Sequence, residues 1–413
     1  MPDFQVQPGE TVLLDRVEGE LTVGKRARIK ARNGKIVVVT GGAYFDGSAK
    51  IYCSFECESM RARGRGYGFG ANIVVSGDLT VHGGIDVDAS LKVDETLNAD
   101  DVDVGGHLKC KSVVSRDVRV GGHMVTSGSL EAKSVAVGGH LAVPGSVKLS
   151  NLHVGGHAKV GGGVISGDIR IRGHFTVGSK LEFGDLKTFG HVRLPPKSKG
   201  EKLLAFGGTE FLGDAFCRIT QVKGTVKVAG DYAAESIEID GKLEVMGSLN
   251  VAKGLEVYGT AKVKRRVECG TIVVTGKLIA DSAHVKGQAD LEGEVKVARA
   301  LKGGSIRVRK GSKVAGPLVG EEIEIGRTTS SHGLRWGGNM IRIGRMTDVQ
   351  DIHGGVVRIG SYSRAKRVLA EVIEMDEGSI ADQVVYTKDI KLPANYHLNK
   401  PPRKVSALPE FPT

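Results

Sequence analysis

The sequence predicts an all-β fold in which a short coil of strands repeats many times to form an elongated parallel β-solenoid. Three observations predict it: a recurring unit of seventeen or so positions, apolar residues that alternate with polar ones inside each unit, and glycine at the corners. Glycine supplies 60 of the 413 residues, about twice its usual share of roughly 7%. Aromatic residues make up only 5%, so small aliphatic side chains have to fill the interior.

The repeat is clearest around six histidines, each of which ends a Gly-Gly-His motif or a close relative of it. They are His107, His123, His140, His157, His174 and His191. The intervals between successive members are 16, 17, 17, 17 and 17 positions. A spacing this regular indicates one structural unit per repeat.

Apolar residues occupy fixed positions around each histidine. Counted from the histidine, they fall at −5 and −3, at +1 and +3, and near +7 and +9. Around His140 they are Val135, Val137, Leu141, Val143, Val147 and Leu149. Each pair flanks one outward residue, which is the period-two pattern of a short strand. Three such strands per repeat predict a triangular coil, and stacking coils about 4.8 Å apart would bury one face of every strand.

The pattern continues beyond the histidines and divides the chain. In the second half the histidine position holds other residues, namely Thr225, Lys242, Thr260, Lys277 and Glu294. The expected segments are a strand-rich candidate cap (1–71), a His-bearing β-solenoid (72–194), a linker or excursion loop (195–218), a second β-solenoid with a less regular end (219–390) and a Pro-rich tail (391–413). The tail is expected to be extended or disordered, because proline cannot donate to a ladder.

Local propensities add two expectations. Glycine should serve corners, where a sharp turn often needs φ > 0. No helical stripe is sustained along the chain, and residues 364–375 are the one stretch compatible with a helix.

The net charge of +11 favours an acidic partner, such as nucleic acid or an anionic membrane surface, although a solvated basic surface is the plainer interpretation. Residues 61–69 mix Arg, Gly and aromatic residues. Such a segment is typical either of nucleic-acid contacts or of a flexible loop between strands.

The six histidines are the sharpest candidate site. Each precedes an inward residue, so the imidazoles should point outward and stack about 4.8 Å apart. The plain interpretation is a corner residue copied by duplication. The alternatives are a strip that binds Zn, Ni or Cu, and a surface that responds to pH around the ordinary imidazole pKa of about 6.5.

Other chemistry is weakly represented. The five cysteines are odd in number and scattered, which argues against a disulfide framework, and the pair Cys53 and Cys57 is only a weak zinc candidate. No catalytic motif is evident, so we expect neither an enzyme nor a cofactor nor a small-molecule substrate. We find no signal peptide and no apolar run long enough to cross a membrane, which favours a cytoplasmic location.

The runs 137–143 (VGGHLAV) and 243–251 (LEVMGSLNV) resemble those of the bactofilins, a family of polymer-forming cytoskeletal proteins. The resemblance covers residues 72–194 and 219–325. It implies a right-handed triangular β-helix that assembles end to end into nonpolar filaments without a nucleotide. Self-association into filaments or other homo-oligomers is therefore expected, because an uncapped end coil presents an unpaired strand edge.

Two enzyme classes remain as alternatives. A carbohydrate-active β-helix enzyme would need long loops that carry a charged cleft, whereas the loops expected here are short. A hexapeptide-repeat enzyme would fill each coil with three six-residue units, which is one position more than this chain prefers.

Overall fold

The structure, a computed structural model, describes residues 3–64, 70–326, 346–394 and 396–409. All regular secondary structure in this part of the chain is β-strand, and the strands pair in parallel, so the predicted all-β parallel solenoid is confirmed. No helix in the described residues is long and apolar enough to cross a membrane.

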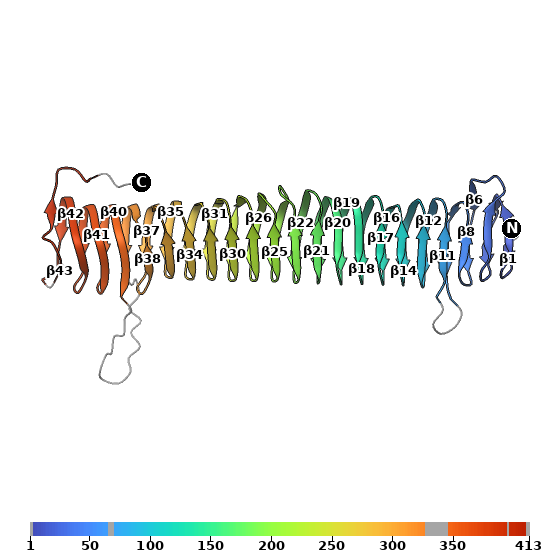
Figure 1. The fold of residues 1–413 in the computed structure, drawn as a ribbon, viewed down its shortest axis with the longest axis horizontal. Helices are drawn as coiled ribbons and strands as arrows, with labels where there is room; N and C mark the ends of the chain where they lie inside the picture. Colours follow the sequence, from blue (N-terminus) through green and yellow to red (C-terminus); the bar gives the residue numbers. More distant parts are fainter. Residues whose placement is uncertain (1–2, 65–69, 327–345, 395, 410–413) are drawn as a thin grey trace, which may run out of the picture. The chain divides into compact units, whose positions relative to one another are not determined.

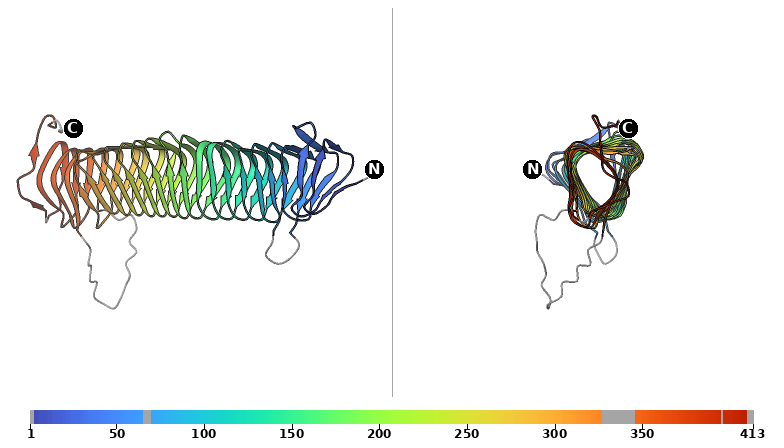
Figure 2. Two further views of the ribbon diagram at one scale, coloured as in Figure 1. Left: turned by 45° about the vertical axis from the view of Figure 1, so that its right-hand side comes forward. Right: turned by 90° about the vertical axis from the view of Figure 1, so that its left-hand side faces the viewer.

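The chain forms two compact units. The first comprises Met1–Lys202 and Phe206–Glu210, and the second comprises Leu203–Ala205 and Phe211–Thr413. Within each unit, successive coils lie side by side (Figure 1). The end-on view in Figure 2 shows the red coils of the second unit as a closed loop, and their interior is filled by buried side chains.

The strands of the first unit are mostly short, with two long ones that turn corners without a break. They are β1 (Phe4–Val6), β2 (Thr11–Leu14), β3 (Arg16–Val17), β4 (Leu21–Val23), β5 (Arg28–Ala31), β6 (Ile36–Val39), β7 (Gly42–Phe45), β8 (Ala49–Ile51), β9 (Ser54–Cys57), β10 (Ser59–Ala62), β11 (Asn72–Val75), β12 (Leu79–Val87), β13 (Ser90–Val93), β14 (Thr96–Val104), β15 (Leu108–Cys110), β16 (Ser112–Val120), β17 (Met124–Thr126), β18 (Leu130–Val137), β19 (Leu141–Val154), β20 (Ala158–Ile171), β21 (His174–Val177), β22 (Leu181–Thr188) and β23 (His191–Leu194).

Two strands, β24 (Lys199–Ala205) and β25 (Gly208–Phe211), contribute residues to both units. The strands of the second unit are β26 (Ala215–Val222), β27 (Thr225–Val228), β28 (Tyr232–Ala234), β29 (Ser236–Ile239), β30 (Lys242–Val245), β31 (Leu249–Val257), β32 (Thr260–Val263), β33 (Arg266–Val274), β34 (Lys277–Ala280), β35 (Ser282–Leu291), β36 (Glu294–Val297), β37 (Leu301–Val308), β38 (Lys313–Ala315), β39 (Leu318–Ile325), β40 (Thr347–Ile359), β41 (Ser363–Met375), β42 (Ile380–Lys391), β43 (His397–Leu398) and β44 (Arg403–Lys404).

A single coil of the first unit shows how the repeat folds. Strand β19 pairs with β20 in three ladders, which begin at Leu141 with Ala158, at Ser146 with Gly162 and at Leu152 with Ile169. Register shifts separate the ladders, so each coil has three faces, and paired residues are 16 or 17 positions apart. The three strands predicted per repeat correspond to the three paired stretches of one coil.

The predicted inward positions form buried columns. In the first unit the residues at +1 are at most 3% exposed: Leu108, Met124, Leu141, Ala158, Phe175 and Val192. The equivalent column in the second unit is equally buried and contains Val226, Leu243, Ala261, Leu278, Val295 and Val314. Burying each such Val or Leu stabilises the fold by roughly 1.5–3 kcal/mol, so stability accumulates coil by coil.

The prediction that residues 364–375 could form a helix is wrong. Strand β41 occupies this stretch and pairs in parallel with β40 on one side and β42 on the other. Buried Ala365 and exposed Arg364 alternate as a strand requires. Pairing on both sides outweighs the local helix propensity of these residues.

The linker expected at 195–218 is also wrong, because β24 and β25 lie inside it and β26 begins in it. Its two prolines precede β24, where a missing N–H removes no ladder bond. The buried hydroxyl of Ser198 donates to the Pro195 carbonyl at 2.9 Å, which holds this turn. Beyond the turn, Leu203 and Ala205 are buried in the interior.

The expectation for the tail 391–413 is wrong in part. The short strands β43 and β44 both pair with β42, and Pro401 and Pro402 lie between them. Lys404 Nζ also lies over the ring of Tyr386, 5.9 Å from its centroid. The two prolines therefore separate β43 from β44, but they do not prevent either strand from pairing with β42.

Coil length varies without breaking the ladders. Near the start of the chain Leu21 pairs with Ala43 and Met60 pairs with Ile85, which are longer intervals than the standard repeat, as the predicted irregular register of 1–71 implies. Late in the second unit the interval doubles, since Leu318 pairs with Ile352. Extra residues are accommodated between strands, so the ladders on either side stay continuous.

Candidate functional site

The corner that carries the histidines is built by close contact between coils. A Cβ added to Gly138 would lie 2.2 Å from the carbonyl oxygen of Gly121, and one added to Gly139 would lie 2.6 Å from His123 Nδ1. Neither glycine has a positive φ. At Gly139 the reason for glycine is therefore not a positive φ but the absence of room for a side chain against the preceding coil. Positive φ occurs at other glycines, such as Gly162 and Gly163.

The six histidines form one column, as predicted. Their side chains are exposed, and the centroids of successive rings are 5.0, 4.7, 4.9, 4.8 and 6.1 Å apart from His107 to His191. Most neighbouring rings meet edge to face, and only His157 and His174 are stacked, with 25° between their planes. The regular spacing follows from the coil repeat, because each ring belongs to the next coil.

Two rings of the column bind the backbone of the following coil. The His140 N–H donates to His123 Nδ1 at 3.3 Å, and the His174 N–H donates to His157 Nδ1 at 3.1 Å. An Nδ1 that accepts a hydrogen bond carries no proton, so the proton of the neutral ring lies on Nε2. These two imidazoles therefore present an N–H donor to solvent.

This geometry bears on the predicted metal strip. A metal ion needs an unprotonated ring nitrogen, and at His123 and His157 that nitrogen already accepts a backbone hydrogen bond. Among the described residues, no group of three or more His, Cys, Asp or Glu side chains is arranged to hold a metal ion. Metal binding by the column stays a prediction, and so does its response to pH.

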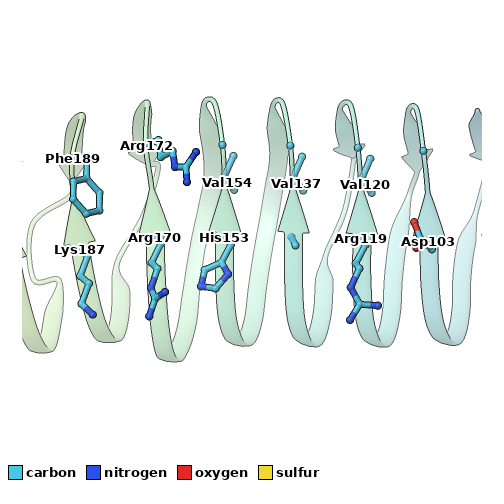
Figure 3. Close-up of a pocket in the computed structure, with 15 residues that line it drawn as sticks. Asp103, Arg119, Val120, Val137, His153, Val154, Arg170, Arg172, Lys187 and Phe189 are labelled. Atoms are coloured by element: carbon cyan, nitrogen blue, oxygen red, sulfur yellow. The ribbon is translucent and has the colours of Figure 1, made fainter.

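A groove that sequence reasoning missed runs along the first unit beside the column. It has a volume of about 1200 Å³ and follows the face formed by the −5 to −3 ladder (Figure 3). One row of its lining residues stands at −4 from each histidine and contains Asp103, Arg119, Ala136, His153, Arg170 and Lys187. Figure 3 shows that Arg119, His153, Arg170 and Lys187 project to the same side, the last three from successive coils.

A second row stands at −2 and forms the floor of the groove. It begins with the first glycine of each Gly-Gly-His motif, namely Gly105, Gly121, Gly138 and Gly155. The same position then holds Arg172 and Phe189. The two altered motifs, Arg-Gly-His and Phe-Gly-His, are the sequence signal for this change, because a repeat that departs from its own pattern marks a local feature.

An exposed aromatic pair lies at this end of the groove. The rings of Phe189 and Phe206 are parallel within 3°, with centroids 5.2 Å apart. The two residues are 56% and 43% exposed, so both rings are accessible at the surface.

The cysteines form no disulfide, as their number and scatter in the sequence predict. All five lie buried in the interior. Burial raises the pKa of Cys57, Cys110 and Cys269 to about 12, so these thiols stay protonated at neutral pH. Their role is packing, since a protonated, inaccessible thiol is a poor metal ligand and nucleophile.

The predicted nucleic-acid segment 61–69 is only partly covered, because residues 65–69 lie outside the described residues. Within the described part, Arg61 and Arg63 both form ion pairs with Asp86. The prediction for this segment therefore stays untested.

Comparison with known proteins adds no assignment, since no family model, no curated protein and no solved structure matches the chain.

Proposed function

We propose that the chain is a structural scaffold of the cytoplasm that self-associates through a strand edge of its solenoid and needs neither a nucleotide nor a catalytic step. The observation that carries this proposal is the edge formed by β1, β2 and β3. These strands pair with β4, β5 and β6, and no other described strand pairs with their outer side. An unpaired parallel edge is a template for pairing with a second copy.

The hydrogen bonds of β1 identify which groups are free. The Phe4 N–H donates to the Glu20 carbonyl at 2.9 Å, and the Val6 carbonyl accepts from the Gly24 N–H at 2.9 Å. Because donors and acceptors alternate along a strand, the N–H and C=O of Gln5 point to the outer side. Exposed Leu13 lies on the neighbouring strand of the same edge, where it adds apolar surface.

The last coil of the second unit is covered differently. There β42 pairs on its outer side with β43 and β44, and two prolines stand between those strands. Proline and short strands blunt an edge. We therefore propose that assembly starts at the β1 edge, and that growth into filaments requires the tail to leave β42.

Five buried cysteines that form no disulfide support the proposed cytoplasmic location, because disulfides are rare in reducing compartments. The bactofilin resemblance supports the same function, since that family assembles end to end.

The test compares Gln5→Pro with Gln5→Ala by sedimentation velocity and negative-stain electron microscopy. Proline removes an outward N–H but none of the bonds from β1 to β4, so we expect the coil to stay folded while association is lost. Gln5→Ala should associate like the parent chain. A parent chain that stays monomeric at every concentration, or a proline variant that assembles normally, would contradict the proposal.

A further inference from the structure

The groove of the first unit is long and open rather than compact. From Asp103 to Lys187 it crosses five coil steps, which corresponds to about 24 Å at about 4.8 Å per step. Its volume of about 1200 Å³ lies above the range of about 300–1000 Å³ that suits small molecules. A groove of this form fits a linear polymer that lies along the glycine floor.

The charges of the lining favour a polyanion. Four Arg or Lys residues and one Asp line the groove, which gives a net charge of +3 with histidine neutral. Within the described part of the chain, Arg119, Arg172 and Lys187 form no ion pair, whereas Arg170 is paired with Asp168 at 2.8 Å. Unpaired cations beside one another repel, so an anionic ligand would stabilise them.

Asp103 locates the ligand within the groove. It pairs in register with Arg119 but forms no ion pair with it in the described part of the chain, so it lowers the positive potential at that end and leaves the Arg119 guanidinium available. The positive charge is therefore concentrated at the other end, where Arg170, Arg172 and Lys187 come from neighbouring coils. This is also the end at which the exposed rings of Phe189 and Phe206 lie.

We propose that this groove binds single-stranded nucleic acid, with its phosphates against Arg119, Arg172 and Lys187 and a base stacked on the Phe189–Phe206 pair. Basic grooves with exposed aromatic rings bind single strands in this way, because every base has a flat face. A lipid surface would not follow a groove with a glycine floor, and the aliphatic and carboxylate side chains of an acidic peptide would leave the two phenylalanine rings without a planar partner.

The binding experiment uses the full chain and a fluorescein-labelled single strand of about 12 nucleotides, as RNA and as DNA, followed by fluorescence anisotropy. If three phosphates are neutralised, log K should fall with log salt concentration with a slope of about −2. A duplex of the same sequence should bind more weakly, because its bases are not available for stacking. No binding of either single strand at low salt would overturn the proposal.

Two sets of variants locate the site. The triple variant Arg119→Gln, Arg172→Gln, Lys187→Gln should lose most of the salt dependence. The matched control, Lys50→Gln, Lys109→Gln, Lys159→Gln, removes the same charge from exposed positions outside the groove and should keep the slope. Equal losses in both sets would show a general charge effect and overturn the proposal.

The aromatic pair has its own test. Phe189→Ala should weaken binding by about 5- to 100-fold, the value of one stacked base, and Phe189→Tyr should restore it. Circular dichroism checks that each variant folds. If the triple variant does not fold, the three single variants of Arg119, Arg172 and Lys187 replace it.

Competition by polygalacturonate or by anionic vesicles that exceeds competition by unlabelled single strand would assign the groove to those ligands and overturn the proposal. Gln5→Pro should bind normally, which separates this proposal from the proposed scaffold function.

Discussion

The same corner of the coil is completed in two ways in the two units. In the first unit, the N–H of His140 and that of His174 each donate to an imidazole of the preceding coil. In the second unit, the equivalent N–H donates to a glycine carbonyl of the preceding coil, at 2.8 Å for Lys242 and 2.9 Å for Thr260. A side chain supplies the acceptor at these two corners of the first unit, and the backbone supplies it at these corners of the second.

This difference gives a reason for histidine at positions 123 and 157. Where the ring accepts the hydrogen bond, the residue type is constrained, because few side chains reach the next coil with an acceptor. Where the backbone accepts it, the side chain is free to vary, and Thr, Lys and Glu all occur. The last histidine of the column already has a backbone acceptor, since the His191 N–H donates to the Gly173 carbonyl at 3.1 Å.

The largest effect should come from the buried interior, a feature that each unit has. Leu141→Ala in the first unit and Leu278→Ala in the second should each lower the free energy of unfolding by about 2–5 kcal/mol, because both side chains are at most 2% exposed. Urea denaturation followed by circular dichroism measures this. Val125→Ala, at an exposed position, is the control and should change little. A small loss at only one of the two leucines would mean that the interiors differ.

The next effect tests the close contact at both corners. Gly139→Ala and Gly259→Ala would place a Cβ 2.7 Å and 2.1 Å from a carbonyl oxygen, and each should destabilise its unit by about 1–3 kcal/mol. Gly84→Ala is the control, because its Cβ would be 4.0 Å from the nearest heavy atom. Thermal unfolding of the three variants measures the difference. The steric explanation of these glycines fails if all three melt alike.

A smaller effect concerns the ion pairs that join coils of the second unit. Arg309 donates two hydrogen bonds to Asp290, at 2.9 and 2.8 Å, and thereby lowers the pKa of that carboxyl group. A carboxylate with a lowered pKa stabilises the fold above its unfolded pKa of about 3.9, and this stability is lost as the pH falls. Arg309→Gln should therefore cost about 1 kcal/mol at pH 7 and progressively less in acid.

The control for this measurement is Lys286→Gln, which removes an exposed charge from the same unit. Urea denaturation at several pH values gives both profiles. A loss in Arg309→Gln that is the same at pH 7 and in acid would mean that the ion pair is not its cause.

The smallest effect is the most specific to the corner. His123→Ala removes the acceptor of the His140 N–H, so this amide should exchange faster with solvent and stability should fall by about 0.5–1.5 kcal/mol. Lys242→Ala should leave exchange at Thr260 unchanged, because the acceptor there is the Gly241 carbonyl. Hydrogen exchange read by mass spectrometry or NMR measures both amides. Faster exchange in both variants would remove the distinction between the corners.

The repeat and its interior could be predicted because they depend on local alternation. Val135 and Val137 flank one outward residue, and this pattern alone places them inside the coil. Strand β41 could not be predicted in this way, because its residues suit a helix and only pairing with β40 and β42 decides the outcome. The turn at Pro195 escapes prediction for a similar reason, since the buried hydrogen bond of Ser198 is not visible in composition.

The candidate site was predictable only in part. The histidine column follows directly from the repeat, but its hydrogen bonds depend on how each ring turns toward the next coil. The groove joins residues from successive coils and becomes visible only when one position is compared through successive repeats. Arg172 and Phe189 were the available signal, since each replaces a glycine of the motif.

The ladder between β39 and β40 stays in register although the paired residues Leu318 and Ile352 are separated by twice the usual interval. A coil of this chain therefore accepts a doubled length of sequence without disturbing its neighbours. We therefore expect that residues added to a connection between two paired strands would leave those strands paired. Additional sequence could therefore be attached to the solenoid at a selected coil.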